Sequence, residues 1–412
     1  MIINGVHQSG MSDLNVNGII AINSTIKILP ALLFDRFINM ATVDLGKTKM
    51  TSFGRSINSC TVLAFVNLND NQLTSIPEGV FRNCEKMVAL RIMNNQISEI
   101  HENAFEGLFN LGTIDFRNNR IKTLHQDLLR PVTKLQTLVL IDNQIENLHP
   151  NLFQYTTQLS ILWLSNNSIS SLDDELFRNN QRLSSIMLDY NKITKISAAT
   201  FTNMPDLNTL LIDNNAIEEI PVFEQMDSLR TLSLWSNKIS SFPSNVFSKL
   251  SALNSLDLSK NPLKTLQSNF IIQPNLSSIS LSSCSIETIN PGAFSGLSKL
   301  TELSLSNNQL IEITADSFSS VASLTDLNLE NNRIQKIDRE FFGVVPNLRT
   351  LNLRNNVCVN NIFLILSNPE RTVFPQIEEC FNSGWKKNLN YKILILTGVF
   401  VIIFKKISQS YI

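Results

Sequence analysis

The sequence predicts a repeat solenoid of the α/β type, with short parallel strands on a concave sheet and mostly irregular or 3-10 segments on the convex side. Three observations support this prediction. An apolar skeleton around one asparagine recurs along most of the 412 residues. Its period is 24 residues over the most regular part of the chain. A phenylalanine follows ten residues after the asparagine in most units.

Residues 159–180 show the repeating unit most clearly. Leu162 and Leu164 alternate with Trp163, which predicts a strand whose leucines face the core and whose tryptophan stands exposed. Asn167 comes where the chain leaves the strand. Its side-chain amide is expected to bond backbone groups that the turn leaves unpaired.

The consensus position recurs thirteen times in register, which chance does not explain. It is filled by Asn71, Asn95, Asn119, Asn143, Asn167, Asn191, Asn215, Asn237, Asn261, Cys284, Asn308, Asn332 and Asn356. The single cysteine in this column is expected to be a buried thiol.

The phenylalanines are expected to stack as a spine inside the convex side rather than to bind a cofactor. Leu129 takes the place of phenylalanine once. The residues of this spine are Phe81, Phe105, Phe153, Phe177, Phe201, Phe247, Phe294, Phe318 and Phe342.

The array divides the chain into five segments. Residues 14–59 are predicted to be degenerate N-terminal capping repeats, residues 60–347 regular repeats, and residues 348–385 the last repeat with a C-terminal cap. Residues 1–13 carry no usable pattern and remain unassigned. Residues 386–412 form a basic and apolar tail.

The tail contains a largely apolar run, residues 393–404, between lysines. As a helix this run spans about 18 Å, against about 30 Å for the hydrocarbon core of a bilayer. A short membrane anchor therefore requires lysines that reach outward to the interface. A lipid-anchor signal at Asn382-Ser383-Gly384 is a second interpretation, and an interfacial or disordered tail is a third.

Two cysteines flank the end of the array. Cys358 directly follows the last repeat, and Cys380 lies shortly before Trp385. With the phenylalanine-containing 24-residue units, this arrangement resembles the extracellular leucine-rich repeat proteins, particularly the insect type, over roughly residues 14–385. The resemblance implies a curved leucine-rich-repeat horseshoe, a Cys358–Cys380 disulfide that seals the last layer, and roles in recognition, adhesion or innate immunity.

Evidence on the cellular compartment is mixed. Members of this family usually begin with a signal peptide, and none is evident in this chain. Three sequons favour the secretory route, at Asn23, Asn166 and Asn275. Cys60 and Cys84 occupy one position in consecutive units, about 5 Å apart by strand spacing, which is within reach of a disulfide. Two buried thiols are the alternative, and the apolar site favours them over a bridge.

Several classes of function are excluded. A net charge of −1 provides no basic footprint for nucleic acid. The sequence shows no nucleophile beside a base, no glycine-rich phosphate loop and no convergent carboxylate pair, so neither an enzyme nor a cofactor is predicted. His101, His125 and His149 recur at repeat spacing, but parallel side chains on a flat ladder rarely reach the tetrahedral geometry of zinc. No metal site is predicted.

The concave sheet carries the most informative surface. Positions that face outward repeat with the unit, so they form columns across the strands. One column contains an apolar stripe about 15 Å long over four strands, formed by Val139, Trp163, Met187 and Leu211. Four further apolar residues broaden this stripe, Ile141, Ile161, Tyr190 and Trp235. We call the stripe and these four residues together the central patch.

Charged residues border the central patch, namely Arg91, Arg117, Asp189 and Asp213. Strands favour β-branched and aromatic residues on either face, which offers a bland explanation of the stripe. Later units, however, carry Ser280, Ser304 and Asn328 in the same column, so strand propensity does not account for it. A contiguous apolar surface with a charged rim is typical of a protein interface with an aromatic anchor.

The sequence therefore predicts a non-enzymatic module that binds a protein partner through its concave face, outside the cell or on its surface. In the first alternative the same face mediates homodimerisation of an adhesion or matrix protein. The second alternative is an intracellular scaffold, which the missing signal favours and a Cys358–Cys380 bridge contradicts.

Overall fold

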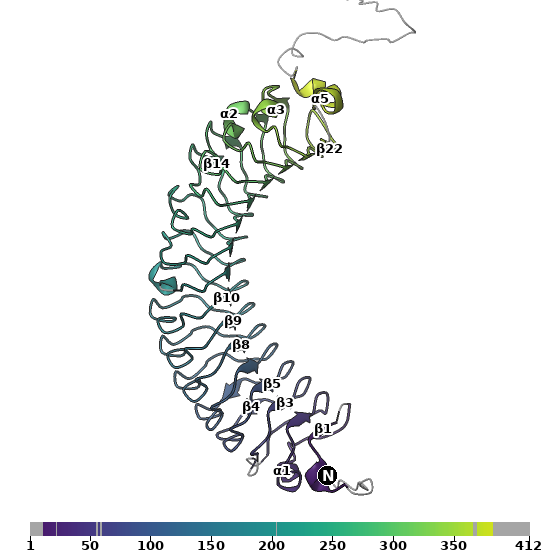
Figure 1. Ribbon diagram of the computed structural model, residues 1–412, viewed down its shortest axis with the longest axis vertical. Coiled ribbons are helices and arrows are strands. Elements are labelled where there is room, and N and C mark those ends of the chain that lie inside the picture. The colour runs from purple at the N-terminus through teal and green to yellow at the C-terminus, as the bar shows by residue number, and fades with distance from the viewer. Residues whose placement is uncertain are drawn as a thin grey trace, which may run out of the picture.

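The computed structural model describes residues 11–21, 23–54, 57, 60–202, 204–365 and 369–381. Figure 1 shows a single curved arc, with the strands along its inner side and the return segments outside. This is the leucine-rich-repeat horseshoe expected from the sequence, with a parallel sheet on the concave side. Most of the first unassigned segment, the lipid-anchor motif and the apolar tail lie outside the described residues.

One sixteen-stranded sheet lines the concave side. Every neighbouring pair in it is parallel except the last, in which β22 runs antiparallel to β21. Its strands are β1 (Gly18–Ile20), β2 (Thr42–Asp44), β3 (Phe65–Asn67), β5 (Ala89–Arg91), β7 (Thr113–Asp115), β8 (Thr137–Val139), β9 (Ile161–Trp163), β10 (Ser185–Met187), β11 (Thr209–Leu211), β12 (Thr231–Ser233), β13 (Ser255–Asp257), β15 (Ser278–Ser280), β17 (Glu302–Ser304), β19 (Asp326–Asn328), β21 (Thr350–Asn352) and β22 (Ile362–Leu364).

The return segments consist mostly of turns. In the described residues, three two-stranded parallel sheets bridge neighbouring returns, β4 (Ser75–Ile76) with β6 (Glu99–Ile100), β14 (Thr265–Leu266) with β16 (Thr288–Ile289), and β18 (Glu312–Ile313) with β20 (Lys336–Ile337). The helices are short, namely η1 (Asp13–Asn15), α1 (Leu32–Arg36), η2 (Ala199–Phe201), α2 (Ala315–Phe318), α3 (Phe341–Val344), α4 (Pro369–Thr372) and α5 (Phe374–Phe381). No described helix is long and apolar enough to cross a bilayer.

The core lies between the sheet and the returns and continues from one unit to the next. The middle residue of each strand faces inward, so Leu162 and Ile186 are fully buried. Phenylalanine rings stack behind them as predicted, with centroids 5.8 Å apart between Phe153 and Phe177. The spine differs from the prediction elsewhere. Phe105 stacks on Phe116, Phe247 contacts Phe242, and Phe341 rather than Phe342 contacts Phe318.

The consensus asparagines form the predicted ladder, and Asn119 shows how. Its Oδ1 accepts the backbone N–H of Ile97 in the preceding unit at 3.0 Å. Its Nδ2 donates to the carbonyl oxygens of Ile92 and Phe116 at 2.9 and 3.0 Å. One buried amide therefore satisfies backbone groups in its own turn and in the preceding unit. Cys284 keeps the column buried and donates its thiol to the carbonyl oxygen of Leu258.

Disulfides lie near both ends of the array. Cys358, after β21, is joined to Cys380 in α5, which holds this helix against the last repeat. Cys60 is joined to Cys84 with their Cα atoms 4.6 Å apart. Cys60 and Cys84 therefore form a disulfide, and the interpretation as two buried free thiols, which their apolar site favoured, is wrong.

Replacing a ladder asparagine by alanine is expected to destabilise the array strongly. In Asn119→Ala, one buried N–H loses its acceptor and two buried carbonyl groups lose a donor, which costs about 3 kcal/mol. Urea denaturation followed by circular dichroism measures this loss.

The neighbouring Asn118 provides a matched control. It is exposed, adopts a φ of 54° and donates to Asn94 on the surface. Asn118→Gly keeps a residue that tolerates positive φ and is expected to lose less than about 1 kcal/mol. Equal losses for the two variants would contradict the role assigned to the ladder.

Candidate functional site

Strand register brings the apolar stripe together. Val139 on β8 pairs with Trp163 on β9, which pairs with Met187 on β10, and Met187 pairs with Leu211 on β11. Their side chains alternate with the buried middle residues of the strands, so they lie in one row on the concave face. The geometry expected from the repeat spacing is therefore present.

The row is less exposed than the sequence predicts. Val139 is only 4% exposed, and Trp163 is half-buried instead of standing free in solvent. Adjacent parallel strands lie about 4.8 Å apart, so large side chains in one row cover each other's flanks. The Nε1 of Trp163 also reaches the hydroxyl of Ser185 on the next strand at 3.4 Å. The expectation of a fully exposed tryptophan is wrong for this reason.

The other apolar residues widen the row on both sides. Ile141, Ile161 and Trp235 are half-buried on the concave face. Tyr190 is 54% exposed and follows the strand at a turn position with a φ of 54°. The ammonium group of Lys260 lies 4.4 Å from the ring centre of Trp235. The central patch thus consists of partly exposed apolar side chains around the nearly buried Val139.

The two arginines of the rim differ in environment. Arg91 on β5 is exposed. Arg117 is partly buried and its Nη2 lies 3.3 Å from Asp115 Oδ2. Its Nε is buried without an acceptor in the described part of the chain.

The two aspartates of the rim accept hydrogen bonds from neighbouring strands. Asp189 accepts from the hydroxyl of Ser165. Asp213 accepts from the hydroxyl of Ser233 and, at 2.8 Å, from the backbone N–H of Trp235. The pKa of Asp213 is raised to about 6, mainly by burial and additionally by the carboxylates of Asp257 and Asp189, although these donors lower it. A charge in this position is costly without a cation beside it.

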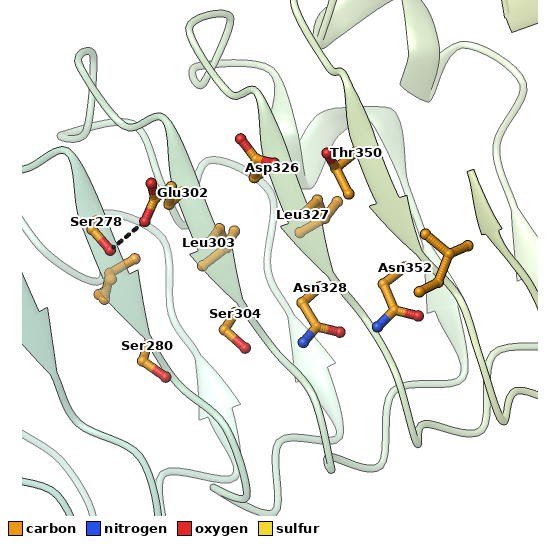
Figure 2. Close-up of a pocket in the computed structure, with 12 residues that line it drawn as sticks. Ser278, Ser280, Glu302, Leu303, Ser304, Asp326, Leu327, Asn328, Thr350 and Asn352 are labelled. Carbon is orange, nitrogen blue, oxygen red and sulfur yellow. Dashed lines mark hydrogen bonds between the residues drawn. The ribbon is translucent and has the colours of Figure 1, made fainter. Parts of the chain in front are cut away.

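Beyond the central patch the concave face becomes polar and hollow. Figure 2 shows the hollow, with Leu303 and Leu327 among the residues that line it. Its volume is about 460 Å³. Its polar lining comes from Ser278, Ser280, Glu302, Ser304, Asp326, Asn328, Thr350 and Asn352. Continuing the outward columns past the stripe would have identified these residues.

The histidine column has a local structural role. The Nδ1 atoms of His101, His125 and His149 each accept a backbone N–H from two residues further along the chain, at 3.2–3.3 Å. Each ring therefore caps the turn that begins its return segment. In the described residues, no group of three or more histidine, cysteine or acidic side chains has a geometry suited to a metal ion.

The three sequon asparagines are exposed. Asn166 donates to the carboxylate of Asp142 at 2.6 Å. Asn275 donates to the carbonyl oxygen of Ser251 and accepts from the ammonium group of Lys299. Asn23 lies near the N-terminal end of the sheet, in a turn with a φ of 56°.

Removing the charge of Asp213 is expected to stabilise the protein at neutral pH. Because the pKa is raised on folding, the ionised carboxylate of Asp213 lowers the free energy of unfolding above about pH 6. Below about pH 4 the carboxyl group is protonated in both the folded and the unfolded state, and this loss of stability disappears. Asp213→Asn keeps an acceptor for Ser233 and Trp235. It should gain about 1–2 kcal/mol at pH 7.5, allowing for solvent screening, and lose this advantage as the pH falls from 6 to 4.

Melting temperatures at pH 7.5, 6.0 and 4.5 measure this effect. Asp206→Asn, at an exposed position in a return segment, controls for the change in net charge. An advantage of Asp213→Asn that stays constant across this pH range would contradict the assignment.

Solved structures from several organisms share this fold. A chain in the Toll–Spatzle complex of Drosophila matches with a TM-score of 0.70 and 23% identity, covering 79% of this chain and 45% of that one. The ectodomain of the Arabidopsis thaliana receptor kinase GASSHO1/SCHENGEN3, in complex with CASPARIAN STRIP INTEGRITY FACTOR 2, matches with a TM-score of 0.62 and 24% identity, covering 82% and 41%. A leucine-rich repeat protein of Leptospira interrogans matches with a TM-score of 0.55 and 21% identity, covering 84% and 91%. At these identities the similarity establishes the fold, and this chain spans less than half of the first two.

Two family models match the chain itself, whereas no curated protein does. The model described as Leucine rich repeat matches residues 157–217, 222–271, 274–334 and 322–363. The model described as BspA type Leucine rich repeat region (6 copies) matches residues 12–110 and 51–181. These matches extend with short gaps from residue 12 to residue 363 and coincide with the repeating units of the horseshoe. The chain belongs to the leucine-rich repeat proteins.

Proposed function

We propose that this chain is a non-enzymatic recognition module that binds a protein partner through the central patch. The observation that carries the proposal is the confinement of apolar side chains to neighbouring strands of the concave face. Trp163, Met187 and Leu211 occupy successive strands, whereas Ser280, Ser304 and Asn328 occupy the same column later. The inward residues alone are sufficient to form the strands and the core. The apolar character of the outward residues therefore requires another explanation, and a binding surface provides one.

Two of the similar structures support a protein as the partner. One is the complex of Toll with Spatzle, and the other is a plant receptor ectodomain bound to CASPARIAN STRIP INTEGRITY FACTOR 2. In both complexes, a chain with a fold similar to that of this protein is bound to a second protein or peptide. A concave sheet suits this use, because each repeat adds one strand and one set of outward side chains to the same surface.

We further propose that the module acts outside the cell or on its surface. Two disulfides join residues in neighbouring layers, and such bridges persist in oxidising compartments. The three exposed sequons are compatible with glycosylation in the same compartment. Anchorage through residues 386–412 remains a proposal from sequence alone.

Replacing the anchor tryptophan by aspartate is expected to abolish partner binding without unfolding the array. Trp163 is half-buried on the outward side of β9, so the substitution removes an interface residue rather than a core residue. The full chain and Trp163→Asp would serve as baits for extracellular proteins from the source. A partner that uses the patch should bind the variant at least about 30-fold more weakly.

The matched control is Asn328→Asp, which introduces the same charge in the same column on β19. Circular dichroism establishes that all three proteins are folded. Light scattering identifies the alternative function. A wild-type dimer that becomes a monomer in Trp163→Asp would show that the patch mediates self-association. Equal retention of every partner by wild type and Trp163→Asp would refute the proposal.

The extracellular placement predicts that Cys60, Cys84, Cys358 and Cys380 are oxidised in protein from its source. Mass spectrometry after alkylation without reduction should therefore detect alkylation only at Cys284 among these five residues, and only after denaturation, because its thiol is buried. Alkylation at Cys358 and Cys380 under these conditions would favour an intracellular scaffold instead.

A further inference from the structure

The concave face has a charge asymmetry that the whole chain lacks. We consider the first and third residue of each strand and the residue two positions after it, which together form the outward columns. From β8 to β19 these columns contain six carboxylates and no lysine or arginine. The carboxylates are Asp189, Asp213, Asp257, Glu302, Asp326 and Glu330. The chain as a whole has a net charge of only −1.

The strands before β8 show a different pattern. There Arg91 and Arg117 balance Asp44 and Asp115 in the same columns. The negative surface therefore begins at Asp189 after β10, within the apolar stripe, and continues past the stripe to the hollow of Figure 2. Within the described part of the chain, none of the six carboxylates forms an ion pair. One basic group, the ammonium of Lys260, lies over the ring of Trp235, outside the outward columns.

The acidic and apolar groups are within reach of one short segment. Leu211 pairs with Ser233 on β12, which pairs with Asp257 on β13. Two strand spacings separate Leu211 from Asp257, about 10 Å, which three residues of an extended chain span. Asp213 lies two residues beyond Leu211 in the neighbouring column.

We propose that the partner of the central patch is a cationic polypeptide segment that places apolar side chains on Trp163, Met187 and Leu211 and lysine or arginine side chains against Asp213 and Asp257. The inference rests on the function proposed above and adds the chemistry of the partner. Charge complementarity is its basis, because every charged side chain in the outward columns beside the patch from β8 to β19 is acidic.

Other occupants fit this face less well. A neutral apolar segment would desolvate Asp213 further without supplying a counter-charge, which opposes binding. A second copy whose two-fold axis passes through the acidic strands β10 to β13 would bring Asp189, Asp213 and Asp257 close to their equivalents, and like charges repel. A basic segment meets neither obstacle and relieves the repulsion among these carboxylates.

Binding of synthetic peptides to the full chain tests the inference. The probe is a 14-residue peptide that carries leucine at every third position and lysine at every third position. Serine and glycine fill the remaining positions. Its two counterparts replace every lysine by glutamine or by glutamate. Fluorescence anisotropy should show that the lysine peptide binds at least tenfold more tightly than the glutamine peptide. The glutamate peptide should not bind, and the affinity for the lysine peptide should fall as salt increases.

Variants of the protein locate the effect. Asp213→Asn combined with Asp257→Asn should weaken the lysine peptide at least tenfold. Asp206→Asn combined with Asp227→Asn removes the same charge from exposed return segments and should change the affinity less than twofold. Trp163→Ala, which leaves the charge unchanged, should weaken the lysine and glutamine peptides alike.

The outcomes separate the inference from the proposed function. If the glutamine peptide binds as tightly as the lysine peptide and both depend on Trp163, the patch binds polypeptides but the charge inference is wrong. If the lysine peptide binds independently of Trp163, the proposed function of the patch is wrong. Lack of binding by all three peptides overturns the cationic segment, and the bait experiment then decides the function separately. A dimer that is unaffected by salt would identify a second copy as the occupant.

Discussion

The whole array depends on one interaction, the buried hydrogen bonding of a side-chain amide to backbone groups at the end of each strand. Every turn off a three-residue strand exposes N–H and C=O groups that the next strand cannot pair. Asn119 bonds an N–H of the preceding unit and carbonyl groups of two turns, so it both closes its own turn and fixes the distance to its neighbour. Repetition of this bond sets the register of the sheet, and the register sets the columns of the concave face.

Concave curvature then determines what the outward residues can do. Side chains that point toward the inside of an arc converge, so a tryptophan in such a row is flanked by its neighbours. Trp163 is half-buried between Val139 and Met187, and its indole N–H is directed to Ser185. Large side chains in this position are held in place before any partner binds, which lowers the entropy lost on binding. In the function proposed above, the crowding that makes the patch less exposed would therefore also favour binding.

The same crowding changes the chemistry of the polar residues. Asp213 accepts a hydroxyl and a backbone N–H, yet burial and the neighbouring carboxylates of Asp257 and Asp189 keep its pKa near 6. The raised pKa of Asp213 follows first from its burial and then from the carboxylates of Asp257 and Asp189 on nearby strands. Alternation of residue types along the chain could not reveal this, because Asp213 and Asp257 are separated by two units in sequence and by two strands in space.

By itself the sequence determined the horseshoe, the asparagine ladder, the inward core and the row in which Val139, Trp163, Met187 and Leu211 lie. All of these follow from a period that repeats thirteen times, so each position is specified by its place in the unit. Only the tertiary structure decided how far Trp163 is exposed, that Phe341 rather than Phe342 continues the ring stack, and that Cys60 is joined to Cys84. The physical reason is that a period specifies which side a residue faces. Exposure, ring contact and sulfur bonding depend on distances between units, which the curvature of the folded arc sets.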